Sequence, residues 1–154
     1  MSSYKELFMQ EYSDIYEKLN INIKKNPQVE QYKLYCSKLS RTANTEFAKG
    51  VKAEASGKFD KAIDHYSTAK QNFKELLKEA DANIADEDIL SWFIRLITSS
   101  RSVFSAASGI LSFIKSDFNI KDVTRENVKD DIQMMISICD DSINRCKKSL
   151  NKKE

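Results

Sequence analysis

Glycine and proline are scarce in this chain of 154 residues, which holds three of the former and one of the latter. A sheet protein of this size needs many tight turns, and those turns draw heavily on both residue types. Their scarcity therefore favours a few long helices joined by short connections. The length is enough for about one domain with a real core, so we expect residues 1–154 to form a single helical domain.

A long apolar run is also lacking. Nowhere does the chain hold the roughly 18 consecutive apolar residues that a membrane-spanning helix requires. The first six residues contain no apolar core of a secretory signal. We therefore expect a cytoplasmic protein that makes no contact with a membrane.

The chain has no strong excess of charge, because 25 basic and 23 acidic side chains leave a formal net charge of +2. That balance creates no field that would draw the whole protein to nucleic acid. Positive charge does gather at residues 147–154, a basic tail in which the last helix could fray. Its lysines are Lys147, Lys148, Lys152 and Lys153. A solvated helix end explains them, since cations suit the C-terminal end of the helix dipole, and phosphate binding is the alternative.

Groups that carry out chemistry are few. The single histidine, His65, has no matched nucleophile or second ligand near it in the sequence. Cys36, Cys139 and Cys146 fall in apolar helical patterns without the spacing of metal ligands, which indicates reduced thiols inside the core. A glycine-rich phosphate loop is absent as well. We therefore expect no enzymatic activity, no metal site and no cofactor.

Apolar residues recur three and four positions apart in five segments, which predicts five helices and no strand. The segments are residues 3–24, 27–56, 58–83, 87–116 and 124–150. Pro27 suits the first position of the second helix, while Asp86 and Thr124 can cap the fourth and the fifth. Ser, Thr and Asn between positions 40 and 45 could interrupt the second helix. The fourth helix is apolar well beyond one stripe, which is typical of a helix in the middle of a bundle.

The most informative stretch begins at Gly57, where a tight turn leads into a helix with small and aromatic residues on one face. Those residues are Phe59, Ala62, Tyr66, Ala69 and Phe73. Alanine leaves room for a second helix to approach closely, and the rings fill the remaining space. The pattern predicts an antiparallel helical hairpin in which Ala62 and Ala69 face the neighbouring helix.

Residues of about 43–80 resemble a tetratricopeptide (TPR) unit. Gly50 falls where that family has a small residue for close helix crossing, and Gly57 and Phe59 match its turn and following aromatic residue. The same residues also resemble the microtubule-interacting-and-transport (MIT) domain, a three-helix module that binds short helical tails. Only one convincing copy is present, and Glu46 and Lys49 depart from the large apolar residues that TPR units have.

The resemblance implies a scaffold whose partner lies along the first helix of the hairpin. The residues on that face are Asn44, Phe47, Val51, Glu54 and Ala55. Phe47 and Val51 stand where carboxylate-gripping TPR units have polar groups, so a clamp for a C-terminal carboxylate is not supported. In the alternative interpretation, Phe47 and Val51 simply pack against the N-terminal helix.

The function predicted from these features is a non-enzymatic adaptor that binds a segment of another protein on a helical face. The alternative is a small stoichiometric inhibitor or immunity protein, which would block an enzyme or toxin through an acidic patch that includes Asp130 and Asp131. Nucleic-acid binding through the basic tail is the less favoured third hypothesis. Homo-oligomerisation remains compatible with each of them.

Overall fold

The computed structural model describes residues 4–19, 27–83, 85–108, 110, 123–124 and 126–153. These residues form five α-helices and no strand, which confirms the predicted all-α bundle. The helices are α1 (Tyr4–Leu19), α2 (Pro27–Ala55), α3 (Phe59–Asn83), α4 (Glu87–Ser108) and α5 (Val128–Lys153). The expected ends of the first helix, beyond residue 19, and of the fourth, beyond residue 110, lie outside the described residues.

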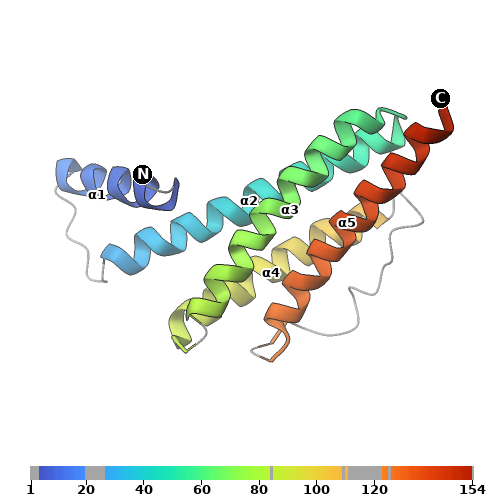
Figure 1. Ribbon diagram of the computed structural model, residues 1–154. Coiled ribbons are helices and arrows are strands. Elements are labelled where there is room, and N and C mark those ends of the chain that lie inside the picture. Colours follow the sequence, from blue (N-terminus) through green and yellow to red (C-terminus); the bar gives the residue numbers. More distant parts are fainter. Residues whose placement is uncertain are drawn as a thin grey trace.

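Helices α2 and α3 form an antiparallel hairpin, and α5 runs along α3 on the side away from α2 (Figure 1). Helix α4 crosses the opposite face of this layer (Figure 1). Helix α1 packs near the N-terminal half of α2 (Figure 1) and also contacts Glu79 of α3. Helix α2 continues without interruption through residues 40–45. Helix α5 continues to Lys153, so the basic tail is helical.

Local signals explain where the helices begin and end. Gly57 has a φ of 74°, a left-handed conformation that glycine adopts without the steric cost of a Cβ. Its N–H donates to the Glu54 carbonyl at 3.0 Å and the Lys58 N–H donates to the Ala53 carbonyl at 2.8 Å, the two bonds of a Schellman motif. Asp86 caps α4, because its Oδ1 accepts the Ile89 N–H at 3.1 Å.

Before α5, the backbone N–H of Thr124 donates to Oδ1 of Asn127 at 2.7 Å, and the Thr124 carbonyl accepts the Val128 N–H at 3.0 Å. This is the side-chain-to-backbone half of a capping box. Val123 and Val128 are both buried, in the positions of a hydrophobic staple. The predicted start of the last helix thus coincides with real capping contacts.

The core lies where α4 crosses the hairpin. The rings of Phe47 and Phe104 stack with centroids 3.8 Å apart and planes 5° apart, and Phe73 meets Phe104 edge-on at 5.6 Å. Ala62 and Ala69 are fully buried, as the hairpin pattern predicts. Helix α4 nevertheless has one solvent-exposed face, which includes Arg95 and Ser102. The expectation that α4 is surrounded by other helices is therefore wrong for this face.

Candidate protein-binding surface

The predicted binding stripe on α2 faces inward. Phe47 and Val51 are fully buried, so they do not line an open groove. Phe47 contacts Tyr66 of α3 and Phe104 of α4 rather than α1, so the alternative that it packs against the N-terminal helix is also wrong. The apolar stripe of α2 serves the core, because α4 covers it from the far side of the hairpin.

Glu54, the charged member of that stripe, is held in a polar network inside the bundle. Only 4% of its side chain is exposed. Arg145 of α5 donates to it twice, from Nε at 2.6 Å and from Nη2 at 2.8 Å, and the Tyr66 hydroxyl donates at 2.7 Å. Arg145 also donates to the buried hydroxyl of Ser142. Glu54 therefore ties α2, α3 and α5 together and is not presented to a partner.

This network changes the acidity of its members. Burial raises the pKa of Tyr66 most, and the hydrogen bond to Glu54 and the nearby carboxylate charge raise it further. Burial acts to lower the pKa of Arg145, but the hydrogen bond and charge of Glu54 outweigh it, so the pKa is raised. Tyr66 thus stays a hydroxyl donor and Arg145 stays a cation at neutral pH.

Asn44 and Ala55, the other two residues predicted to bind a partner on this face, are neither fully buried nor part of one continuous surface. Asn44 is half-buried, and its buried Oδ1 has no hydrogen-bond partner among the residues that the structure describes. Ala55 is exposed at the C-terminal end of α2, beside the hairpin bend. Neither extends an accessible surface along the helix.

Asp130 and Asp131 point in different directions, as adjacent residues on a helix do. Asp130 is exposed, whereas most of the Asp131 side chain is buried with its Oδ2 3.9 Å from Nη1 of Arg101. Burial raises the pKa of Asp131, although the positive charge of Arg101 lowers it. The pair therefore does not form one acidic patch on the surface.

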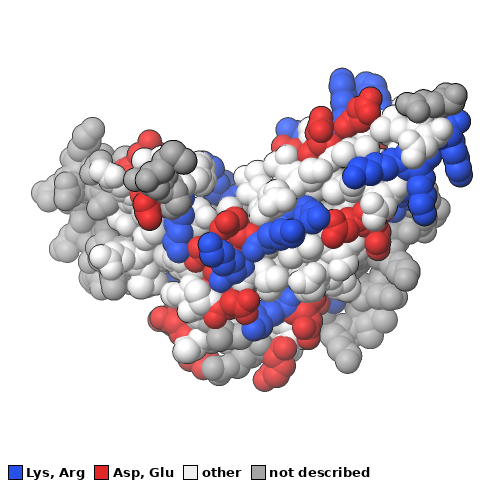
Figure 2. Space-filling view, in the orientation of Figure 1, with Lys and Arg blue, Asp and Glu red and all other residues white. Residues whose placement is uncertain are grey.

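Lysine side chains gather at the end of the molecule where α5 terminates, with acidic side chains beside them (Figure 2). Lys147, Lys148 and Lys152 of the basic tail are exposed, and Lys153 is the last residue of α5. Exposed Lys58, just before α3, and exposed Lys61, in its first turn, lie at the same end of the bundle, near the Glu54–Arg145 pair. The basic tail is thus part of a mixed, solvated surface.

The remaining candidates for chemistry have structural partners. Nδ1 of His65 lies 2.6 Å from Glu46 Oε2 and joins α3 to α2. Cys36, Cys139 and Cys146 are buried and form no disulfide. Within the described ranges no cluster of histidine, cysteine or acidic side chains could hold a metal ion, and none of the described helices could cross a membrane.

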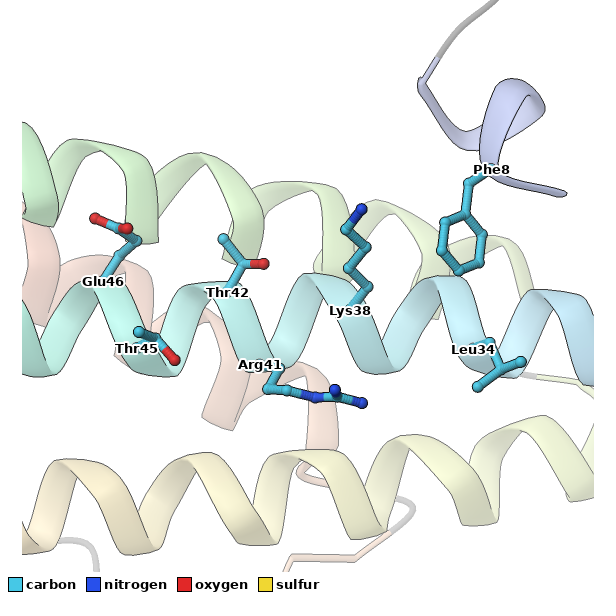
Figure 3. Close-up of a pocket in the computed structure, with 7 residues that line it drawn as sticks. All are labelled: Phe8, Leu34, Lys38, Arg41, Thr42, Thr45 and Glu46. Atoms are coloured by element: carbon cyan, nitrogen blue, oxygen red, sulfur yellow. The ribbon is translucent and has the colours of Figure 1, made fainter. Parts of the chain in front are cut away.

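The accessible groove lies on the opposite, outer face of α2 (Figure 3). It has a volume of about 560 Å³ and is lined by Phe8, Leu34, Lys38, Arg41, Thr42, Thr45 and Glu46. Phe8 reaches the groove from α1, and the other lining residues come from α2 (Figure 3). The predicted binding residues Phe47 and Val51 lie on the buried face of this helix, because an apolar stripe at helical spacing is typical of a side that faces the core.

A row of exposed cations follows this outer face at helical spacing. Its members are Lys38, Arg41, Lys49 and Lys52, and we refer to them as the α2 cation row. Lys38 lies over the rings of Tyr4 at 4.6 Å and Phe8 at 5.4 Å, and Lys49 is 3.9 Å from Glu46. No described carboxylate forms an ion pair with Arg41 or Lys52. These residues recur in steps of three, eight and three positions, a spacing that places them on one face of the helix.

The chain matches no protein-family model, no curated protein and no solved structure. The resemblance of residues 43–80 to TPR and MIT hairpins therefore stays a prediction. The structure defines the architecture as an all-α bundle with one tight helical hairpin.

Proposed function

We propose that the chain is a protein-binding module and that the outer face of α2 is its binding surface. The partner would be an acidic amphipathic helical segment, laid along the groove with its carboxylates toward the α2 cation row. The observation that carries this proposal is the position of Arg41, an exposed guanidinium in the groove with no described carboxylate paired to it. A guanidinium can hold a carboxylate through two parallel hydrogen bonds.

The shape of the surface supports an elongated ligand. Lys38 and Lys52 are fourteen positions apart, which on a helix is about 21 Å at 1.5 Å per residue. A partner helix of about four turns would match that length. Leu34 and Phe8 lie at one end of the groove, where an apolar side chain of the partner could be buried. Apolar anchors and flanking charges are the usual elements by which a groove recognises a helix.

The inward face of α2 supports the same function indirectly. Phe47, Val51 and Glu54 fix that face in the core, so α2 offers its outer face on a rigid support. A preorganised surface loses less conformational entropy on binding than a flexible one. The adaptor hypothesis has more support than an inhibitor that acts through α5, because Asp131 faces Arg101. Buried cysteines without disulfides favour a reducing compartment such as the cytoplasm.

Selection from a displayed library of random 16-residue peptides tests this proposal. Peptides selected on the full chain should be enriched in Asp and Glu three or four positions apart. Each should bind the Arg41→Glu variant at least tenfold more weakly, because the substitution places a like charge in the groove. Lys61→Glu, an exposed position on α3, is the matched control and should bind as the unmodified chain does.

Two outcomes would overturn the proposal. Selected peptides without an acidic bias would contradict the assigned partner chemistry. Equal affinity for Arg41→Glu and the unmodified chain would contradict the assigned surface. A single-stranded oligonucleotide serves as a competitor. If it bound more tightly than any peptide, and only with Lys147, Lys148 and Lys152 intact, the nucleic-acid hypothesis would replace this one.

A further inference from the structure

Lys5 of α1 is bound by a carboxylate and two tyrosine rings that belong to the hairpin. Its Nζ lies 2.9 Å and 2.8 Å from the two carboxylate oxygens of Glu79 in α3. The same ammonium lies 4.9 Å from the ring centroid of Tyr32 and 5.8 Å from that of Tyr35, both in α2. A carboxylate combined with aromatic faces is a chemistry that recognises ammonium groups.

The hairpin organises this site through its own contacts. The Tyr32 hydroxyl donates to Glu79 Oε2 at 2.7 Å, and Nδ2 of Asn83 donates to the Glu79 carbonyl at 2.8 Å. Glu79, Tyr32 and Tyr35 are all buried. A carboxylate in such a position is stable only with a cation beside it. While α1 is docked, Lys5 supplies this cation.

The side-chain contacts described for α1 lie between residues 4 and 9, around Lys5. The rings of Tyr4 and Phe8 both lie near the Tyr35 ring, with centroids 6.4 Å and 6.2 Å from it. Leu7, in the same segment, remains 53% exposed. In the part of the chain that the structure describes, the α1 ribbon lies apart from α4 and α5 (Figure 1). Most of the stability of a helix in a protein comes from tertiary packing, so we expect these contacts to hold α1 in place.

We propose that Tyr32, Tyr35 and Glu79 form a receptor for a lysine-bearing helix, and that α1 is an internal ligand which a partner helix can replace. The partner would carry the pattern that α1 shows at residues 4–8: an aromatic residue, lysine, two residues of any kind and a second aromatic residue. We refer to Tyr32, Tyr35 and Glu79 as the ammonium receptor. This ligand is a basic helix and differs from the acidic one of the proposed function, although the two sites share Phe8, which lines the groove while α1 is docked.

The test uses a labelled peptide of residues 1–19, stapled through positions 7 and 11 because both are exposed and i,i+4 on the helix. Its binding is measured by fluorescence anisotropy to the full chain and to the Lys5→Glu variant, in which a like charge at Glu79 undocks the resident helix. We expect at least tenfold tighter binding to Lys5→Glu than to the unmodified chain. A Lys5→Ala substitution in the peptide should reduce that affinity at least tenfold.

Glu79→Gln added to Lys5→Glu should remove the gain in affinity, while Glu75→Gln, at an exposed neighbour on α3, should leave it. The thermal unfolding midpoint of each variant establishes that the bundle is intact. Equal binding of the lysine and alanine peptides would overturn the proposal. A dimer of the unmodified chain that Lys5→Glu dissociates would also overturn it, because α1 would then be exchanged between two copies.

Discussion

Gly50 of α2 lies directly against the ring of Tyr66 of α3, where a Cβ would come within 2.7 Å of two ring carbons. Real Cβ atoms do not approach carbon so closely, and the Tyr66 ring has little freedom to move. It is fully buried, it contacts Phe47, and its hydroxyl donates to Glu54. The close approach of α2 and α3 therefore requires glycine at position 50.

Gly50→Ala should destabilise the protein by about 1–3 kcal/mol, because an extra carbon in a filled core forces side chains or backbone to shift. The sign of the change in the free energy of unfolding is informative, because glycine to alanine at an open helix position stabilises a protein by up to about 1 kcal/mol. Urea unfolding followed by circular dichroism measures the difference. Lys49→Ala, at the exposed neighbour, should change stability by less than about 0.5 kcal/mol. A more stable Gly50→Ala variant would contradict the close contact.

Alanine substitutions on opposite faces of α2 should change the stability of the protein by different amounts. Phe47→Ala should cost about 3–5 kcal/mol, because it removes a buried ring that stacks on Phe104. Arg41→Ala should leave stability within about 0.5 kcal/mol, because the side chain is exposed. Thermal unfolding of both variants checks the assignment. If Phe47→Ala were as stable as Arg41→Ala, Phe47 would not belong to the core.

The Glu54–Arg145 pair should show strong coupling. Arg145→Met leaves the buried Glu54 carboxylate without its cation. We expect the free energy of unfolding to fall by up to about 3 kcal/mol. The loss is limited to this value because 27% of the arginine side chain is exposed. The double variant Glu54→Leu/Arg145→Met should lose clearly less free energy of unfolding than the two single variants lose together. A double-mutant cycle from denaturant unfolding gives the coupling. Additive losses would mean that the two side chains do not stabilise each other.

Stability should decrease in alkali because of the buried thiols. Burial raises the pKa of Cys36, Cys139 and Cys146 to about 12, from an ordinary value of 9.0. Between these values the unfolded chain loses thiol protons that the folded chain keeps. The free energy of unfolding therefore falls as the pH rises from about 9 toward 12.

Urea midpoints at pH 7, 9, 10 and 11 measure this decrease. The Cys139→Ala variant should show a smaller decrease than the unmodified chain, because one of the titrating groups is gone. Tyr35 contributes in the same direction, since burial raises its pKa to about 12 as well, so part of the decrease should remain. An identical pH dependence of both proteins would contradict burial of the Cys139 thiol.

Local sequence signals were enough to predict the helices and the hairpin bend. Pro27, Gly57 and Asp86 mark boundaries through local chemistry: a fixed φ, a left-handed turn and a capping carboxylate. Ala62 and Ala69 face the neighbouring helix because their spacing defines one side of α3. Such features depend on residues only a few positions apart, so periodicity and capping rules suffice to predict them.

The packing of distant helices determines which face of α2 is exposed to solvent and which cations pair with the buried carboxylates. Apolar residues and basic residues both recur along α2 at helical spacing. The packing of α3 and α4, with Tyr66 and Phe104 against Phe47, buries the apolar set. Glu54 is paired with a residue 91 positions away and Glu79 with one 74 positions away. No local pattern encodes such pairs, because a buried carboxylate becomes stable only when a distant element brings its cation.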